Sequence, residues 1–339
     1  MSARYLNRTM VTGAKRPLSV RLALASLPLF AAFACGACAE ALDPIAWLQK
    51  IATAARQLNY AGSFVYQHGR QVETSRIAHW ADADGEHEKL STLDGRPREI
   101  IRNNDNVFCY LPESKAVLIT KRNGRQFPSL LPEDLAGIAD NYVVRKGEVD
   151  RVAGAECQMI VLEPRDNLRY GHRFCAEVSS GLLLRARTYN DKNELIESFS
   201  FTDLVQGSAV SRDLLKSAYA AKSQGWRIDR TALDRGELSA DSGWTLKSPP
   251  PGFRKINEMR RVMAGRPSVS HLVYSDGLAA ISIFIEPLPK TSPAAGPLAY
   301  QGSVNIYVKP QAEQMLTVVG ETPARTVRLV AESLSPRER

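Results

Sequence analysis

The sequence predicts an α+β protein in which one amphipathic helix packs against a large antiparallel sheet, followed by a smaller α+β domain. Three observations predict this fold. Apolar residues recur at helical spacing after Pro44, short strands separated by turn residues follow as far as residue 205, and strands and helices resume after residue 241. With 339 residues and 44% apolar residues, the chain is long enough for two domains.

The first 39 residues have the pattern of a secretory signal peptide. Five Lys and Arg residues come first, residues 22–39 are uncharged, and Ala37-Cys38-Ala39 has the small-x-small form of a cleavage site. We expect export to the periplasm with cleavage near Ala39. Two alternatives stay open: a membrane anchor, since the run reaches the minimum length of a span, and a lipoprotein signal at Cys35 or Cys38, which lacks the usual upstream Leu.

Export changes the charge argument. The leader holds five of the 44 Lys and Arg residues and none of the 36 acidic ones, which leaves the mature chain with a net charge of only +3. The high isoelectric point therefore gives no support for a nucleic-acid partner.

The mature chain opens with a helix. Asp43 is a suitable N-cap and Pro44 suits the first helical position. A stripe of apolar residues at helical spacing predicts the face that packs on the sheet; it includes Ile45, Leu48, Ile51 and Leu58.

The strands expected next are short, regularly spaced and joined by turns, which predicts an antiparallel sheet, open or barrel-like. A partly helical segment at 127–144 interrupts them. The expected strands cover 61–67, 73–80, 86–93, 99–111, 116–122, 151–164, 172–178, 181–190 and 195–205.

Cys157 and Cys175 flank a turn centred on Asp166. Paired positions in an antiparallel hairpin have a constant sum, so these cysteines should face each other and form a disulfide in an oxidising compartment. Two buried free thiols are the alternative. Cys109 is expected to remain a lone buried thiol.

The second half is expected to be a small domain. We assign residues 1–39 to the leader, 40–205 to the sheet domain, 206–240 to a linker and 241–339 to the C-terminal domain. Within 206–240, Ser211 could cap a short helix through Tyr219. The C-terminal domain should contain helices at 253–263 and 324–334, a hairpin at 271–287 and a Pro/Gly-rich loop at 287–301.

No nucleotide-binding, nucleophile-elbow or zinc-protease motif occurs in the sequence. Asp82, Asp84, Glu86 and His87 lie close together, but the position of Gly85 breaks the EF-hand register, which favours a solvated turn. We expect neither a catalytic site, a metal nor a cofactor.

A basic stretch contains Arg254, Lys255, Arg260 and Arg261. On the expected helix these residues would project outward. They are candidates for a surface that binds an acidic protein segment or a lipid phosphate, although a solvated helix face is the simpler interpretation.

Four sequence blocks resemble a known family: "DPIAWLQKIATAARQLNYAGSFVY", "CAEVSSGLLLRARTYN", "HLVYSDGLAAISIFIEP" and "LTVVGE". They are similar, in order, to the MucB/RseB family of periplasmic regulators of the sigma-E envelope-stress response. The resemblance implies an N-terminal half-open antiparallel β-barrel with plugging helices, similar to the lipoprotein carriers LolA and LolB. The apolar stripe of the first helix would then be a candidate wall of a lipid cavity.

The resemblance also implies a partner and a mechanism. The family binds the periplasmic part of a transmembrane anti-sigma factor, RseA or MucA, and shields it from the site-1 protease DegS or AlgW. Mislocalised lipoprotein or lipopolysaccharide is the implied signal for release. The alternative is a periplasmic lipid or lipoprotein carrier, and a homo-oligomer stays open.

Overall fold

Helix α1 (Pro44–Gln57) is the first element in the computed structural model, and it begins at the predicted N-cap. The Asp43 carboxylate accepts a hydrogen bond of 2.8 Å from the Ala46 N–H, and Pro44 occupies the first turn. Leu48 and Ile51 are fully buried. The structure describes residues 43–121, 127–230, 237–238, 241–261, 268–289 and 295–337, so the predicted leader lies outside the described residues.

A twelve-stranded sheet forms the N-terminal half. Its strand order is β12-β6-β5-β4-β3-β2-β1-β11-β10-β9-β8-β7, and every neighbouring pair is antiparallel except β12 with β6. The strands are β1 (Tyr60–His68), β2 (Gln71–Asp82), β3 (Gly85–Thr92), β4 (Glu99–Asn103), β5 (Asn106–Leu111), β6 (Ala116–Lys121), β7 (Tyr142–Val152), β8 (Ala155–Pro164), β9 (Gly171–Glu177), β10 (Leu183–Tyr189), β11 (Leu195–Gln206) and β12 (Arg227–Asp229).

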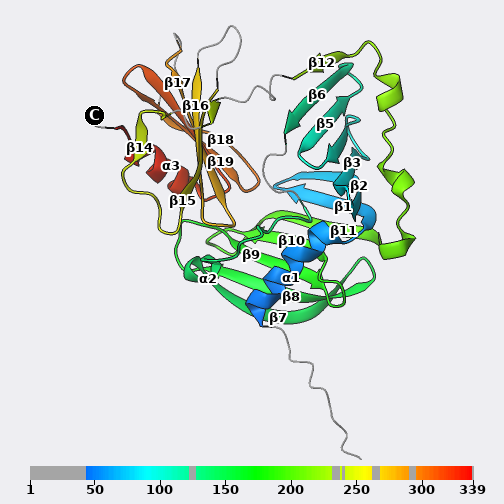
Figure 1. Cartoon of the computed structure of the whole chain (residues 1–339). Helices are drawn as coiled ribbons and strands as arrows, with labels where there is room; N and C mark the ends of the chain where they lie inside the picture. Colours follow the sequence, from blue (N-terminus) through cyan, green and yellow to red (C-terminus); the bar gives the residue numbers. More distant parts are fainter. Residues whose placement is uncertain are drawn as a thin grey trace, which may run out of the picture. The chain divides into compact units, whose positions relative to one another are not determined.

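Helix α1 lies on this sheet, as Figure 1 shows beside β7–β10. Its buried face joins one hydrophobic core with Tyr60, Phe64 and Phe174. A short helix, α2 (Ile138–Asn141), falls in the segment expected to be partly helical. The predicted combination of a large antiparallel sheet and a covering helix is therefore confirmed.

The segment after β11 runs back along the sheet. It contains three 3₁₀ turns: η1 (Gly207–Ala209), η2 (Arg212–Leu215) and η3 (Ala220–Lys222). The Ser211 hydroxyl accepts from the Asp213 N–H at 3.3 Å, so the predicted cap is present, but the turn ends at Leu215 rather than Tyr219. Val210 and Leu215 pack on apolar residues of β1 and β2, which holds this segment on the sheet up to β12.

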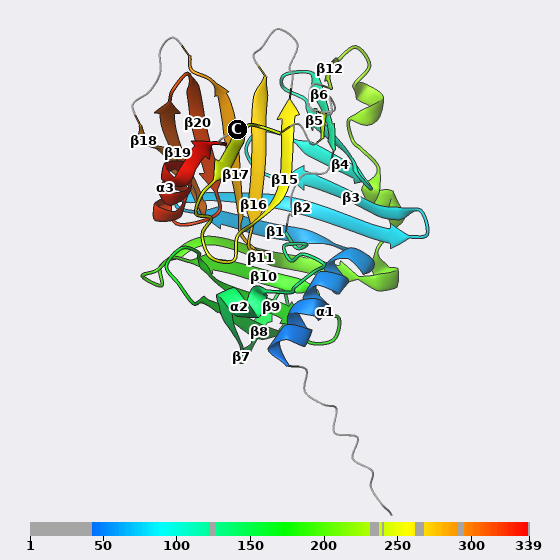
Figure 2. The ribbon, with the colours of Figure 1, turned by 60° about the vertical axis from the view of Figure 1, so that its left-hand side comes forward.

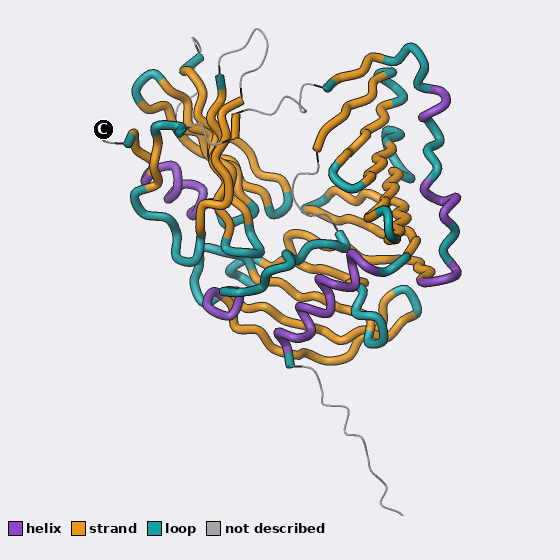
Figure 3. Tube along the Cα trace, in the orientation of Figure 1, coloured by secondary structure: helices purple, strands orange, loops and turns teal. Residues whose placement is uncertain are grey.

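The C-terminal half has a seven-stranded sheet covered by one helix. Figure 2 shows α3 lying against β18–β20, and Figure 3 shows how strongly strands outnumber helices. The strand order is β13-β15-β16-β17-β20-β19-β18. The elements are β13 (Glu237–Leu238), β14 (Trp244–Leu246), β15 (Arg254–Arg261), β16 (Val269–Ser275), β17 (Ala280–Pro287), β18 (Gly296–Gln301), β19 (Val304–Gln311), β20 (Gln314–Gly320), α3 (Ala324–Ser333) and β21 (Leu334–Pro336), with β14 paired to β21.

Two expectations for this half are wrong and two are confirmed. The expected helix at 253–263 is strand β15, because its residues pair with β16 across a hairpin, and tertiary pairing outweighs a weak helical spacing. The expected loop at 287–301 includes strand β18. The helix at the C-terminus is confirmed as α3, and the hairpin at 271–287 as β16–β17.

A disulfide joins Cys157 on β8 to Cys175 on β9, as predicted. The predicted register is wrong, however. Cys157 lies opposite Glu177 and Cys175 opposite Met159, so the two cysteines are diagonal neighbours with Cα atoms 5.3 Å apart. The turn is centred one residue later than its sequence suggests. Diagonal neighbours on one face are still close enough to bond.

Candidate ligand cavity

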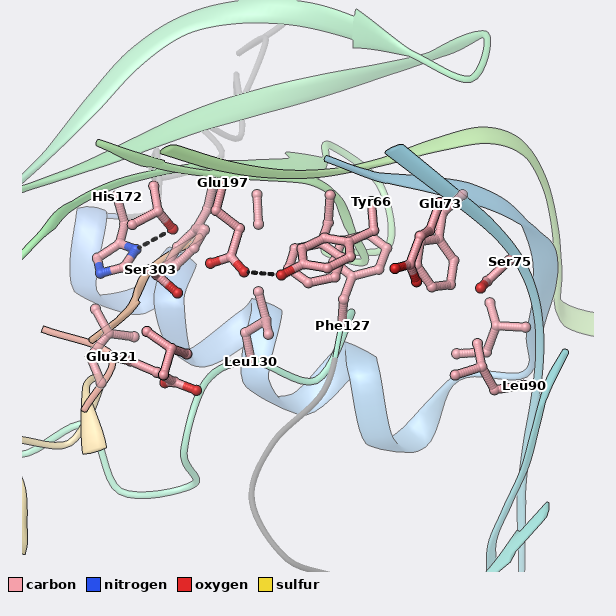
Figure 4. Close-up of a pocket in the computed structure, with 18 of the residues that line it drawn as sticks. Tyr66, Glu73, Ser75, Leu90, Phe127, Leu130, His172, Glu197, Ser303 and Glu321 are labelled. Carbon is pink, nitrogen blue, oxygen red and sulfur yellow. Dashed lines mark hydrogen bonds between the residues drawn. The ribbon is translucent and has the colours of Figure 1, made fainter. Parts of the chain in front are cut away.

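A cavity of about 580 Å³ lies on the face of the large sheet that alternate side chains of β1–β4 and β9–β11 share. This volume falls in the range of small-molecule sites, about 300–1,000 Å³. The period of two along each strand places Phe64 and Tyr66 of β1, and Glu197 and Phe199 of β11, on the cavity side. Figure 4 shows Tyr66 and Glu197 of these strands with Phe127 and Leu130 beneath them.

One row of cavity residues is aromatic and apolar. Strand register sets Phe174, Ala186, Phe199 and Tyr66 side by side across β9, β10, β11 and β1. The rings of Tyr66 and Phe199 stack with centroids 4.3 Å apart, and Phe127 stacks on Phe199 at 5.3 Å. This row offers an apolar chain a continuous wall.

The next row, two residues along each strand, is polar. Register places His172, Thr188, Glu197 and His68 across the same four strands. The Tyr66 hydroxyl donates to Glu197 Oε1 at 2.6 Å, and Thr188 Oγ1 lies 3.4 Å from His172 Nδ1, as Figure 4 shows. The cavity therefore changes from apolar to polar within two residues of each strand.

Burial and charge set the protonation states of this row. Burial lowers the pKa of His172 to about 4, so its imidazole is neutral at neutral pH. Burial, followed by the hydrogen bond to Glu197 and the charges of Glu197 and Glu73, raises the pKa of Tyr66. The Tyr66 hydroxyl thus remains a donor.

Acidic residues outnumber basic ones on the cavity wall. Glu73, Glu88, Glu197 and Glu321 line it, and Arg98 is the one Lys or Arg among the described lining residues. Glu88 is neutralised by Arg102, whose Nη1 lies 3.2 Å from Glu88 Oε2. The wall therefore carries more negative than positive charge.

The C-terminal half completes the cavity. Leu278, Ala279 and Ala280 from the β16–β17 turn line it, as do Ser303 and Val304 at the β18–β19 turn. A Cβ placed on Gly302 would lie 2.9 Å from His68 Cβ and 3.7 Å from Glu197 Oε1. This turn therefore packs directly on the polar row.

A buried ion pair holds the tip of the β16–β17 hairpin on the N-terminal half. Arg169 Nη1 donates to Asp276 Oδ2 at 2.6 Å, and both side chains are fully buried. Arg169 also donates to Asp166 and to the Pro251 carbonyl, and the Tyr142 hydroxyl donates to Asp276 at 3.3 Å. Burial alone would lower the pKa of Arg169, but Asp166 and Asp276 raise it, so the guanidinium stays charged.

None of the four predicted helix residues lines this cavity. Leu48 and Ile51 are fully buried in the core under α1, Leu58 packs on that core, and Ile45 is exposed. The residues that do line it belong mainly to strands. Alternation in "AGSFVYQ" and "LIESFSF" was the available signal, but only strand register brings those residues together.

The predicted basic surface is divided because β15 is a strand. Arg254, Lys255 and Arg260 are all exposed, but consecutive strand residues point to opposite faces, so Arg254 and Lys255 diverge. Lys255 Nζ lies 2.5 Å from Glu258, and Arg260 donates to Ser268. Arg261 lies in β15, and its side chain is outside the described part of the chain.

The acidic turn after β2 is a hydrogen-bonded turn. The Asp82 carboxylate accepts from the Asp84 N–H and from Trp80 Nε1, and it pairs with Arg212. Within the described ranges, no group of three or more His, Cys, Asp and Glu residues could hold a metal ion. Cys109 is a half-buried free thiol, and burial raises its pKa. None of the helices described is long and apolar enough to cross a bilayer.

Two family models match the chain in order. The MucB/RseB N-terminal domain matches residues 43–219, and the MucB/RseB C-terminal domain matches residues 238–335.

Curated relatives match over most of their length. "Sigma factor AlgU regulatory protein MucB" of Pseudomonas aeruginosa is 32% identical over 302 residues, which cover 88% of this chain and 92% of that protein. "Sigma-E factor regulatory protein RseB" of Escherichia coli K12 is 26% identical over 296 residues, or 85% and 89% of the two chains. Both relatives carry the names of regulatory proteins.

Solved structures match over both halves. The crystal structure of MucB in complex with MucA(peri) has a TM-score of 0.69 and 29% identity, covering 88% of this chain and all of that one. The complex structure of Pseudomonas aeruginosa MucA/MucB has a TM-score of 0.70 and 29% identity, covering 87% and 99%.

Proposed function

We propose, because this chain belongs to the MucB/RseB family, that it is a periplasmic negative regulator of a sigma-E-type stress response. It binds the periplasmic part of a transmembrane anti-sigma factor and shields that segment from site-1 proteolysis. The observation that carries this proposal is the match, over 88% of the chain and across both halves, to a MucB structure in complex with MucA(peri).

Release of the partner needs a ligand that binds the partner-free and the partner-bound forms of the protein with different affinities. A ligand can lower partner affinity only if it binds the partner-free form more tightly, and the coupling is reciprocal. The cavity supports this role because residues from both halves line it, from Phe199 on β11 to Ser303 at the β18–β19 turn. An amphiphile inside it would contact both halves at once.

The first experiment is a calorimetric titration of the protein with the periplasmic segment of the anti-sigma factor from the same cell. Saturable one-to-one binding at micromolar affinity or better is expected. The segment should also resist cleavage by the site-1 protease in the presence of the protein. No binding at high concentration would contradict the regulatory role.

A repeat of the titration with a saturating lipoprotein acyl chain or lipopolysaccharide tests release. The affinity for the anti-sigma segment should fall. Unchanged affinity with the lipid bound would reject these ligands as the release signal while leaving partner binding intact.

The basic residues of β15 remain our proposal for the partner surface. The double variant Arg260→Glu with Arg261→Glu should lose partner binding and keep lipid binding. Asp191→Asn, which removes one member of an exposed ion pair with Arg325, is the control.

A lipid or lipoprotein carrier is the second candidate, and the apolar, aromatic row in the cavity of about 580 Å³ favours it. A carrier would copurify with acyl chains and transfer cargo between vesicles. Transfer without any binding of the anti-sigma segment would establish the carrier and exclude the regulator.

A further inference from the structure

One edge of the large sheet is formed by β12, which pairs with β6 and ends the strand order. Figure 1 shows β12 beside β6 at this end of the sheet. The chain reaches it through the 3₁₀ turn η3 and a tight turn, in which the Trp226 N–H donates to the Ser223 carbonyl at 3.0 Å. We call five residues of this segment the β12 edge: Lys222, Trp226, Arg227, Ile228 and Arg230.

The β12 edge is basic. Lys222, Arg227 and Arg230 are all exposed, and Asp229 is the one acidic residue between positions 222 and 230. Within the part of the chain that the structure describes, no carboxylate lies within ion-pair distance of these three cations. Lys115 is a fourth exposed cation beside them, because its carbonyl accepts from the Arg227 N–H at 2.9 Å. The positive charge of this edge is therefore not neutralised by ion pairs with the described carboxylates.

The same edge exposes apolar and aromatic surface. Ile228 has 56% of its surface exposed, although it lies within a strand. Trp226 is half-buried, and the centroid of its ring lies 6.2 Å from that of Tyr219. Trp226 and Arg230 flank β12 directly, so an indole and a cation lie within two residues of the exposed aliphatic side chain.

An anionic bilayer surface fits this combination of side chains. Tryptophan and basic residues gather at the lipid–water interface, where the indole N–H stays hydrated and the cation meets phosphate. An exposed aliphatic side chain gains free energy by entering the acyl boundary. Each cation near an anionic surface increases the affinity roughly fivefold. An added peptide strand would find only the three residues of β12 to pair with, so strand addition by an acidic protein segment is a poorer fit.

We propose that the β12 edge docks the protein on a bilayer that contains anionic phospholipid. Ile228 and Trp226 lie at the acyl boundary, and the cations lie at the phosphates. This contact goes beyond the proposed function, which concerns the anti-sigma segment and the cavity. Because the proposed partner spans a membrane, attachment to the same bilayer would raise the effective concentration of the protein at its partner.

The test measures binding of the purified protein to sedimented vesicles. Vesicles of phosphatidylglycerol and phosphatidylcholine in equal parts should bind at least about tenfold more tightly than vesicles of phosphatidylcholine alone. Binding should weaken as the salt concentration rises, because salt screens exposed charges. Equal binding to both kinds of vesicle would overturn the proposal, as would no binding to the anionic ones. Soluble polyglutamate is the competing probe: if it binds at this edge and the anionic vesicles do not, the edge belongs to an acidic protein segment.

The double variant Lys222→Glu with Arg230→Glu tests the charge. It should lower the affinity for anionic vesicles at least about tenfold. Arg76→Glu with Lys146→Glu is the matched control, because it makes the same change in net charge at two exposed residues outside the β12 edge. The control should keep the affinity within about threefold, since screening limits the reach of exposed charges. Equal losses in the two double variants would overturn the assignment to this edge.

Ile228→Ser tests the apolar contact. It should lower the affinity about fivefold, as expected when about half of an isoleucine side chain leaves the acyl boundary. Val72→Ser on β2 is the matched control, because Val72 has 57% of its surface exposed, and its affinity should not change. An unchanged affinity in Ile228→Ser would contradict insertion of this side chain.

The fluorescence of Trp226 reports the contact directly. The chain has four Trp residues, so the difference between the parent and Trp226→Phe isolates the signal of Trp226. Anionic vesicles with brominated acyl chains should quench this signal, and bound vesicles that leave it unquenched would overturn the proposal. The calorimetric titration with the anti-sigma segment contains no vesicles, so the regulatory role and the bilayer contact can fail separately.

Discussion

At the scale of single residues, the buried Arg169–Asp276 pair is the contact whose loss should cost most. Asp276→Asn would remove one of the two carboxylates that pair with the fully buried Arg169 guanidinium. No solvent reaches Arg169 to replace the lost carboxylate. Breaking a buried pair in this way costs about 3–5 kcal/mol. Urea unfolding should show a loss of that size.

The matched control for this variant is Asp191→Asn. Arg325 and Asp191 also join the two halves, at 2.6 Å, but both side chains are about half exposed. An exposed pair contributes about 0–1 kcal/mol. Equal losses in the two variants would contradict the importance of burial at Asp276.

The disulfide gives a second prediction at this scale. Cys157 and Cys175 close a loop with a sequence separation of 18. In the chain-entropy picture, a loop of this size stabilises the folded state by about 3 kcal/mol. The double variant Cys157→Ala with Cys175→Ala should lose that amount of unfolding free energy, and an oxidised parent that unfolds at the same urea concentration would contradict it.

The pairing of these cysteines was predictable from sequence, but their register was not. The sum rule locates the turn at Asp166 only if the turn is symmetric. In the structure, Asp166 accepts from the Leu168 N–H and from Arg169, and this local network moves the centre of the turn by one residue. A sequence contains no measure of such an offset.

At the scale of elements, β15 shows where sequence patterns fail. Phe253 and Ile256 have helical spacing, yet Ile256 lies at a bulge in the strand with 63% of its surface exposed. Pairing with β16 decides the conformation of this segment, and the spacing of its own apolar residues does not show that pairing. Helix α1 was predicted correctly because its cap, its Pro and its apolar stripe all lie within one segment.

Glu258 on β15 yields a prediction for pH. Burial raises its pKa, but donors from Lys255 and Ser242 more than offset burial and hold the pKa at about 2, below its usual 4.5. A carboxylate with a lowered folded-state pKa stabilises the fold above the unfolded pKa, and this contribution is lost as the pH falls. Glu258→Gln should therefore be less stable than the parent at pH 6, and the difference should shrink between pH 4.5 and pH 2.

Chemical unfolding across that pH range measures the effect. Glu332→Gln is a suitable comparison, because it removes an exposed carboxylate that pairs with Arg328 on α3. A constant difference between Glu258→Gln and the parent from pH 6 to pH 2 would contradict the assigned hydrogen bonds.

At the scale of the whole molecule, sequence could predict the two halves and the family but not the residues that line the cavity. The strands that build it are far apart in the chain, since Tyr66 on β1 and Glu197 on β11 are 131 residues apart. Its two rows exist only because β11 pairs with β1. The predicted cavity residues on α1 were chosen from a stripe that fills the core instead. Local periodicity identifies which side chains are buried, whereas the fold decides whether those side chains pack in the core or line the cavity.

The Gly302 turn provides the prediction that links the halves. Gly302 has φ +57°, and an added Cβ would lie 2.9 Å from His68 Cβ, closer than such atoms approach. Gly302→Ala therefore combines backbone strain with a clash on the polar row. Gly95→Ala is a matched control, because Gly95 has φ +68° and nothing within 4 Å of the added Cβ.

Both variants should lose about 1–2 kcal/mol of stability from the left-handed backbone. Only Gly302→Ala should also change amphiphile affinity, since moving the turn away from His68 displaces Ser303 from the cavity wall. Parallel titrations of dodecyl maltoside, an uncharged amphiphile with a twelve-carbon chain, and of the anti-sigma segment measure both effects. If the cavity couples the halves, the two affinities should change in Gly302→Ala and stay constant in Gly95→Ala, whereas equal behaviour of the two variants would mean that the turn and the ligand act independently.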